Sequence, residues 1–311
     1  LHILNNNAGG SVVLEGGDVH IEKIQAAGAG SLKLNEANAK YKFGEIVVDA
    51  DNVFALEVDQ NVVLKAPTAG SVNFGSSGNG GKRLSELKFN ADKSLTIENG
   101  VNIYTAELNK TGVNNNGTLI FEGDSILSAD SATQNIKAIE IQGAGNTVKL
   151  SKATKTHQDI KLSNNATLEV AGNVTTDIAG NGANHGLIGV ANGNGHLKFV
   201  NSAAVTVTGN VGGAANALQS IEFNNGNVQF KSAVIHTGKD FKFTGQNESV
   251  VIFDKAGFGD ANFVNASNAD NIKHTVVLAV NDPAKIKNSP TKLLVPGKAI
   301  FAIVNIKNKT P

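Results

Sequence analysis

The stretch LQSIEFNNGNVQF, from Leu218 to Phe230, contains two short runs in which apolar and polar residues alternate. Asn224, Asn225 and Gly226 separate the two runs. Alternation with a period of two puts successive side chains on opposite sides of a β-strand. Asn and Gly tolerate the left-handed backbone conformations that tight corners need. The stretch therefore predicts two short strands joined by a corner.

The same pattern recurs along most of the chain. Two further segments match the first run and are followed by a second strand, namely Leu84-x-x-Leu87-x-Phe89 and Ile136-x-x-Ile139-x-Ile141. A motif of Gly, a polar residue, an apolar residue, any residue and a second apolar residue starts at Gly10, Gly30, Gly70, Gly117, Gly195 and Gly226. Repeats of about 20 to 50 residues indicate a stacked array. A sandwich or barrel also has short, regularly spaced strands, but it would not repeat one local motif so widely.

We therefore predict an all-β, right-handed, single-stranded parallel β-helix (solenoid) with about 20 residues per turn. Each motif strand would lie on its equivalent one turn below, with Leu197 and Phe199 in the core and Lys198 in solvent. Corners are expected at four groups of Asn residues, where stacked amides could also form ladders; ordinary hairpin turns are the alternative. These groups are Asn6-Asn7, Asn114-Asn115-Asn116, Asn164-Asn165 and Asn224-Asn225.

Composition excludes several classes of function. The 27 basic and 27 acidic residues cancel, which gives no electrostatic footprint for nucleic acid or for an anionic membrane. The sequence has no Cys, and hence neither disulfides nor thiolate metal clusters. The first residues lack the basic region and apolar run of a signal peptide, and no apolar stretch is long enough for a membrane-spanning helix. Because Met is absent, we expect a processed product or a fragment.

The last part of the sequence differs from the rest. Pro283, Pro290 and Pro296 lie close together, whereas Pro67 is the only proline before them. We predict a β-helix repeat region over residues 1–275. Residues 276–311 are expected to form irregular C-terminal turns or a cap, since open strand edges need protection.

One string resembles an enzyme motif. Gly123-Asp124-Ser125 is similar to the Gly-Asp-Ser block of a lipase and esterase family that also occurs on some autotransporters. That chemistry needs an oxyanion hole and a His oriented by an Asp. Asp270 and His274 are separated by one residue more than the Asp and His of that family. Asn281-Asp282 lacks the Gly of the family's Asn-containing block, and it follows the His, which is the wrong order. The alternative is an ordinary turn after the strand Thr118–Phe121, and we favour it.

Clustered carboxylates would indicate a β-helix enzyme acting on polysaccharide. Asp49 and Asp51 are the best pair, since residues i and i+2 of a strand share a face, and Glu57 and Asp59 follow. A pair without neighbouring Lys or Arg is more typical of a solvated surface. The sequence lacks the Gly-Gly-x-Gly-x-Asp calcium repeat. We expect no metal and no cofactor.

The remaining candidate residues give little evidence for a functional site. The seven His residues are scattered singly: His2, His20, His157, His185, His196, His236 and His274. The Asn-x-Ser/Thr sequons are Asn109, Asn116, Asn165, Asn173, Asn247, Asn265 and Asn308, and chance accounts for several in a chain this rich in Asn. The Gly-rich stretches Gly78–Gly81 and Gly193–Gly195 lack the Lys and the following helix of a phosphate loop. We therefore predict no catalytic, cofactor-binding or metal-binding residue.

The recurring pattern of short strands and Asn- or Gly-rich corners resembles that of autotransporter passenger domains. The resemblance is to the rickettsial surface cell antigen and outer membrane protein family in particular. The resemblance lies in the general sequence pattern of residues 10 to 260. It is clearest at Ala166–Val174, Ala204–Val211 and Leu218–Phe230. It implies a secreted or surface-displayed bacterial protein at the outer membrane, acting in host-cell adhesion or in a protein coat. Its partner would be a host-cell protein or glycan, or further copies of the chain in a surface layer. No amphipathic barrel strands follow residue 275, so the chain would be only the passenger, or part of it.

Two alternatives of other classes remain open. One is a β-helix enzyme that degrades polysaccharide, which would need a groove with three or more carboxylates and a basic residue. The other is a purely structural surface-layer protein, which would form ordered lattices when purified.

Overall fold

The computed structural model describes residues 2–3, 10–51, 53–76, 82–98, 100–112, 116–130, 135–151, 154–171, 176–180, 186–200, 204–231, 234–235, 237–253, 257–258, 262–265, 273–278, 293–294 and 300–305. The chain divides into two compact units. Unit 1 comprises Leu1–Gln142 and Asn146–His157, and unit 2 comprises Gly143–Gly145 and Gln158–Pro311.

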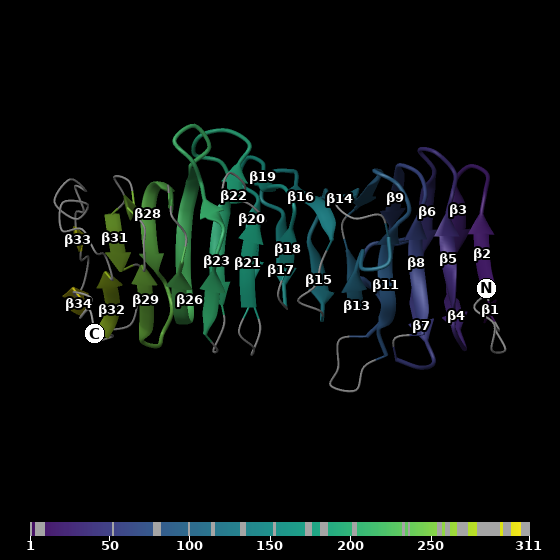
Figure 1. Cartoon of the computed structure of the whole chain (residues 1–311), viewed down its shortest axis with the longest axis horizontal. Helices are drawn as coiled ribbons and strands as arrows, with labels where there is room; N and C mark the ends of the chain where they lie inside the picture. The colour runs from purple at the N-terminus through teal and green to yellow at the C-terminus, as the bar shows by residue number, and fades with distance from the viewer. Residues whose placement is uncertain are drawn as a thin grey trace. The chain divides into compact units, whose positions relative to one another are not determined.

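The fold prediction is confirmed, because the chain is an all-β solenoid of parallel strands (Figure 1). Every strand pairing described is parallel, and the described residues contain no helix. In each unit the chain passes through three stacks of strands in turn and then returns to the first. No helix in the described part of the chain is long and apolar enough to span a membrane.

Unit 1 is built from three stacks, two of which share strand β13 (Val101–Leu108) at a corner. Stack A contains β1 (His2–Ile3), β4 (Ile24–Ala26), β7 (Ile46–Val48), β10 (Val72–Phe74), the start of β13, β15 (Ser125–Ala129) and β17 (Thr147–Leu150). Stack B contains β2 (Gly10–Leu14), β5 (Gly30–Leu34), β8 (Phe54–Val58), β11 (Leu84–Phe89) and the end of β13. Stack C contains β3 (Val19–Ile21), β6 (Lys40–Phe43), β9 (Val62–Lys65), β12 (Ser94–Ile97), β14 (Asn116–Phe121) and β16 (Ile136–Ile141). The last strand of unit 1 is β18 (Thr154–Thr156).

Unit 2 also has three stacks, and β26 (Leu218–Phe230) turns the corner between two of them. Stack D contains β20 (Thr167–Val170), β23 (His196–Val200), the start of β26, β28 (Thr237–Phe243), β31 (Asn262–Asn265) and β33 (Leu293–Leu294). Stack E contains β21 (Thr176–Gly180), β24 (Val205–Val207), the end of β26, β29 (Ser249–Phe253), β32 (Lys273–Leu278) and β34 (Ile300–Asn305). Stack F contains β19 (Ile160–Leu162), β22 (Gly186–Gly189), β25 (Asn210–Val211), β27 (Val234–Ile235) and β30 (Gly257–Phe258).

The register corrects one sequence-based expectation. Gly10–Leu14 lies in register on Gly30–Leu34, as the repeated Gly motif predicts. The other copies of the motif do not stack on one another: Gly70–Phe74 belongs to stack A, and Gly117–Phe121 belongs to stack C. All three stacks require a strand with alternate buried side chains that begins at a corner. The motif therefore marks any strand of the solenoid and not one position in each turn.

The assignment of inward and outward side chains is confirmed where it was predicted. Leu197 and Phe199 are fully buried, and Lys198 points outward between them. Leu119 and Phe121 are likewise fully buried, and Thr118 is partly exposed. Alternate residues face the core because the strand is pleated.

The predicted Asn corners are found in part. Asn164 and Asn165 form an exposed turn, and Asn164 has a φ of 44°, a conformation that Asn accepts more readily than most residues. Asn224 and Asn225 lie inside β26, where it leaves stack D for stack E. Amide ladders form between turns, since Asn102 donates to Asn73 (3.0 Å) and Asn247 donates to Asn225 (3.2 Å). Asn6, Asn7, Asn114 and Asn115 lie outside the described residues.

Strands also occur near the C-terminus. β32 pairs in register with β34 over six residues, so the solenoid continues beyond residue 275 in unit 2. The three crowded prolines, Pro283, Pro290 and Pro296, lie outside the described residues. The boundary at residue 275 stays a prediction.

Candidate functional surface

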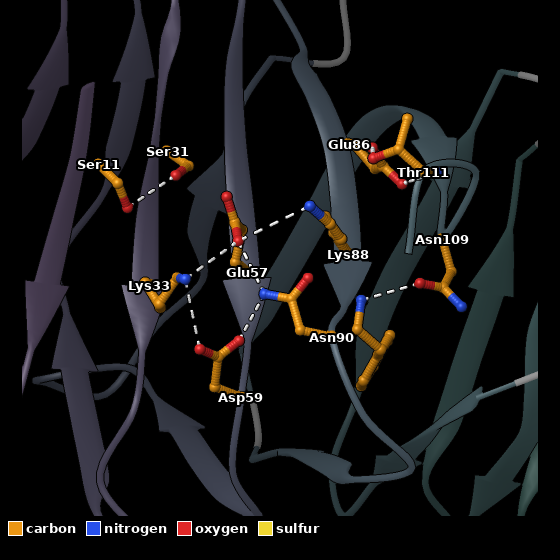
Figure 2. Close-up of polar contacts among 11 residues, drawn as sticks. Ser11, Ser31, Lys33, Glu57, Asp59, Glu86, Lys88, Asn90, Asn109 and Thr111 are labelled. Atoms are coloured by element: carbon orange, nitrogen blue, oxygen red, sulfur yellow. Dashed lines mark hydrogen bonds and ion pairs between the residues drawn. The ribbon is translucent and has the colours of Figure 1, made fainter. Parts of the chain in front are cut away.

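The outer side of stack B in unit 1 carries columns of polar side chains that run across the strands (Figure 2). Because parallel strands in register stack about 4.8 Å apart, equivalent outward residues of successive turns touch each other. One column contains Lys33, Glu57 and Lys88, which are in register on β5, β8 and β11. The charges alternate in sign along it.

The alternating charges pair within this column. The carboxylate of Glu57 lies 3.8 Å from Nζ of Lys33 and 3.9 Å from Nζ of Lys88. Lys33 also lies 3.5 Å from the carboxylate of Asp59. The three side chains of the column are 13 to 29% exposed, so each is partly open to solvent. Opposite charges placed directly across neighbouring strands stabilise their pairing.

A second column alternates carboxylates with amides. Asn35 donates to Glu15 (3.2 Å), and Asn90 donates to Asp59 (2.5 Å) and to Glu57 (2.8 Å). Figure 2 shows Asn90 pointing between the two carboxylates. One amide thus links both columns, and the polar groups of this surface satisfy one another.

The electrostatics of Glu57 follow from these contacts. Burial raises the pKa of Glu57, but hydrogen bonds from Ser31 and Asn90 and the charges of Lys88 and Lys33 outweigh that effect. The net result is a pKa below the ordinary value for Glu. Glu57 is therefore held as a carboxylate, which does not favour a role as a general acid at neutral pH.

The predicted carboxylate cluster is divided between separate contacts. Asp49 accepts a hydrogen bond from Gln25 (3.2 Å), and Asp51 accepts one from the backbone N–H of Arg83 (3.0 Å). Both precede β8, whereas Glu57 and Asp59 lie at its other end and engage Lys33 and Asn90. The four carboxylates thus lie at two ends of one strand.

The Gly-Asp-Ser string lies where a turn becomes a strand. Asp124 accepts a hydrogen bond from the backbone N–H of Thr147 (2.7 Å), and Ser125 is the first residue of β15. Ser125 is 5% exposed, and its hydroxyl has no hydrogen-bond partner in the structure. A nucleophile needs both an accessible oxygen and a base within hydrogen-bond distance. The local geometry therefore matches the turn interpretation.

Stack D of unit 2 carries a similar charged column. Glu169, Lys198, Glu222 and Lys242 are in register on four successive strands, and their signs alternate. Lys198 lies 3.9 Å from the carboxylate of Glu169 and 3.8 Å from that of Glu222. Thr244 donates to Glu222 (2.8 Å), which links this column to the Asn-rich corner.

A Ser–His contact in stack D was missed by the sequence-based search. Nδ1 of His196 lies 2.7 Å from Oγ of Ser220, and Asp240 is in register on the far side of Ser220. The order differs from a catalytic triad, in which His lies between Ser and Asp. Ser220 is 3% exposed, so the contact fits a buried polar ladder. Only the register of the turns brings these residues together, since no local motif links them.

The remaining His residues lie in separate environments. His20 is exposed and lies 2.9 Å from the carboxylate of Glu22, and His157 is half-buried in a turn. His274 is fully buried, with its ring 4.6 Å from that of Phe243. Burial lowers the pKa of His274, and the charge of Glu248 only partly opposes this shift. Of His2 only the backbone is described, and His185 and His236 lie outside the described residues.

The described residues contain no group of three or more His, Cys, Asp or Glu side chains placed to hold a metal ion. Among the sequons, Asn165 and Asn247 are exposed, whereas Asn109 is fully buried and uses its amide inside the fold. Asn116 is half-buried; only the backbone of Asn265 is described, and Asn173 and Asn308 lie outside the described residues. The predicted absence of site residues and cofactors stays a prediction.

Comparison with protein-family models, with curated proteins and with solved structures found no match for this chain. The resemblance to autotransporter passengers therefore rests on the sequence pattern alone.

Proposed function

We propose that the chain is a secreted or surface-displayed bacterial passenger domain that acts as an adhesin or as a component of a surface coat. The observation that carries this proposal is the construction of stacks B and D. Each presents a column of charged side chains, paired along the stack, on a parallel solenoid. Such a surface suits the display of regularly spaced side chains to a large partner.

The enzyme alternative has less support from the described residues. Its two candidate motifs are a buried serine at Ser125 and carboxylates at opposite ends of β8. Neither brings a nucleophile or an acid/base pair to an open groove. The passenger role requires no such site, because binding needs only an extended surface.

Adhesion to host cells is the direct test. Beads coated with the purified chain should bind cultured host cells in a saturable way, and soluble chain should compete. Beads coated with albumin serve as the control. Electron microscopy of purified protein tests the coat role, for which ordered arrays are expected. A chain that neither binds cells nor assembles contradicts the proposal.

A further inference from the structure

The charges in the columns of stacks B and D alternate in sign, but in stack C of unit 1 basic side chains lie next to one another. His20, Lys42 and Lys65 are in register on the successive strands β3, β6 and β9. Like charges directly opposite one another on neighbouring strands destabilise their pairing. A local rule broken without an evident structural gain indicates a functional position.

The basic side chains of this region are only partly paired with carboxylates. Lys65 pairs with Glu98 (2.5 Å), and His20 pairs with Glu22 (2.9 Å). Asp18 lies beside Lys40, but it accepts the backbone N–H of Lys40 (3.2 Å). Within the described part of the chain, neither Lys40 nor Lys42 has a carboxylate within ion-pair distance.

Three lysines of this region lie close together on stack C. Lys40 and Lys42 are two residues apart on β6 and point to the same side, roughly 7 Å apart along the strand. Lys65 lies one strand away, about 4.8 Å across the stack. Lys40 is exposed, and the side chain of Lys65 is 44% exposed, so both can be reached from solvent. Lys40, Lys42, Lys65 and His20 are hereafter the basic cluster.

We propose that the basic cluster binds a sulfated polysaccharide. The inference rests on the proposed function and names the class of partner. Lysine acts as a point charge on a flexible stem, which suits sulfate groups whose positions vary along a chain. A linear polyanion can contact several cations of neighbouring strands at once, and each contact adds to the affinity.

The surface favours a polyanion over a lipid headgroup layer. Peripheral attachment to a bilayer combines cations with apolar side chains that insert into it. The exposed large apolar residues of the described chain are Val13 and Val190, and neither belongs to stack C. The net charge of zero hides the cluster at the level of the whole sequence.

Dextran sulfate and unsulfated dextran of equal length form the test pair. Immobilised dextran sulfate should retain the purified chain at low salt, unsulfated dextran should not, and retention should fall as salt is raised. The double substitution Lys40→Gln and Lys42→Gln should weaken binding by roughly tenfold or more, given the contribution of each lysine near a polyanion. Circular dichroism confirms that the variant is folded.

The matched control removes two other exposed lysines, through Lys82→Gln and Lys231→Gln. It should bind dextran sulfate as the unmodified chain does. Equal losses in both double variants would show binding through overall charge and would overturn the proposal, as would a chain that does not bind dextran sulfate.

Adhesion to cells separates this inference from the proposed function. Cells treated with a sulfation inhibitor should bind fewer coated beads if the inference is correct. Undiminished adhesion to such cells, with no binding to dextran sulfate, would refute the polysaccharide and leave the adhesin role standing. Loss of adhesion to all cells would remove the adhesin role itself.

Discussion

The two units have similar outer surfaces and different cores. Stacks B and D both carry charged columns of alternating sign. Behind the column of stack B the buried residues in register include Leu34, Val58 and Phe89, which are mixed aliphatic and aromatic. Behind the column of stack D they are Val170, Phe199, Phe223 and Phe243, of which the last three are aromatic.

Some aromatic rings in the core of unit 2 stack on one another, while other pairs are tilted or edge to face. Phe223 lies 5.6 Å from Phe199 with an interplanar angle of 5°, and 5.0 Å from Phe243. In stack E, Phe230 and Phe253 stack 5.2 Å apart. Like side chains in register can stack because each turn repeats the backbone of the last. The difference shows that the outer charges are compatible with either kind of core, provided that each turn fills its own layer.

The largest expected effect is the loss of a central ring in unit 2. Phe223→Ala should reduce the free energy of unfolding by roughly 3–5 kcal/mol through lost burial and a cavity. Phe223→Leu keeps most of the volume and should cost about 1–2 kcal/mol, since ring stacking adds about 0.5–1.5 kcal/mol beyond burial. Denaturant unfolding of the three proteins measures both. A Phe223→Leu variant as stable as the unmodified chain would argue against a contribution from stacking.

In unit 1 the largest polar effect is expected at Asn109. This residue is fully buried with a φ of 54°, accepts a hydrogen bond from the backbone N–H of Phe89 (2.9 Å), and donates to the carbonyls of Asn116 and Asn135 (3.1 Å each). Asn109→Ala should cost roughly 2–3 kcal/mol, because it removes these partners from buried backbone groups. Asn164→Ala, at an exposed turn with a similar φ, should cost no more than about 1 kcal/mol. Matching losses would mean that backbone conformation alone explains Asn109.

Acidification should affect the two units at different pH values. The folded-state pKa of His274 in unit 2 lies below 6.5, so the unfolded chain takes up a proton first and stability falls as pH drops below 6.5. The folded-state pKa of Glu57 in unit 1 lies below 4.5, so its contribution is complete above pH 4.5 and is lost only as pH falls through that lower pKa. Hydrogen exchange of both units between pH 7.5 and 5 should show unit 2 opening more easily. His274→Phe should remove this dependence, and its persistence would assign it to another group.

The fold could be predicted from the sequence because the alternation of apolar and polar residues within each strand is visible without its neighbours. Leu197 and Phe199 alternate with Lys198, and Asn and Gly end the run, so local structure and burial follow without knowledge of the partner strand. The register could not be predicted in the same way. Successive turns differ in length, with 20 residues separating Gly10 from its partner Gly30 and 31 separating Ala55 from Glu86.

The candidate surface depends on that register. Lys33, Glu57 and Lys88 become a column only when the lengths of the intervening corners are known. The same holds for His196 and Ser220, and for Lys42 and Lys65. Motif searches examine neighbours in sequence, and they found Asp49 with Asp51 and Gly123 to Ser125. The contacts that distinguish this surface join residues one turn apart.

The smallest expected effect concerns Lys198, at the middle of the charged column in unit 2. Its ammonium group lies near two carboxylates at 3.8–3.9 Å, and its side chain is 31% exposed. Exposed pairs at such distances contribute little, so Lys198→Ala should change the free energy of unfolding by no more than about 0.5 kcal/mol. Leu197→Ala, one residue away but fully buried, should cost roughly 2–5 kcal/mol.

The charge of Lys198 can be separated from its packing by a reversal. Lys198→Glu would place three carboxylates in register on β20, β23 and β26, and like charges opposite one another are unfavourable by roughly 0.2–1 kcal/mol per pair. Raising the salt concentration should reduce this loss, since the repulsion of partly exposed charges is screened. Proteolysis coupled to mass spectrometry would locate the loosening in the turns that touch β23. If Lys198→Ala proved as costly as Leu197→Ala, the outer column would be holding the turns together as strongly as the core, and the contrast between paired surface and buried interior would be wrong.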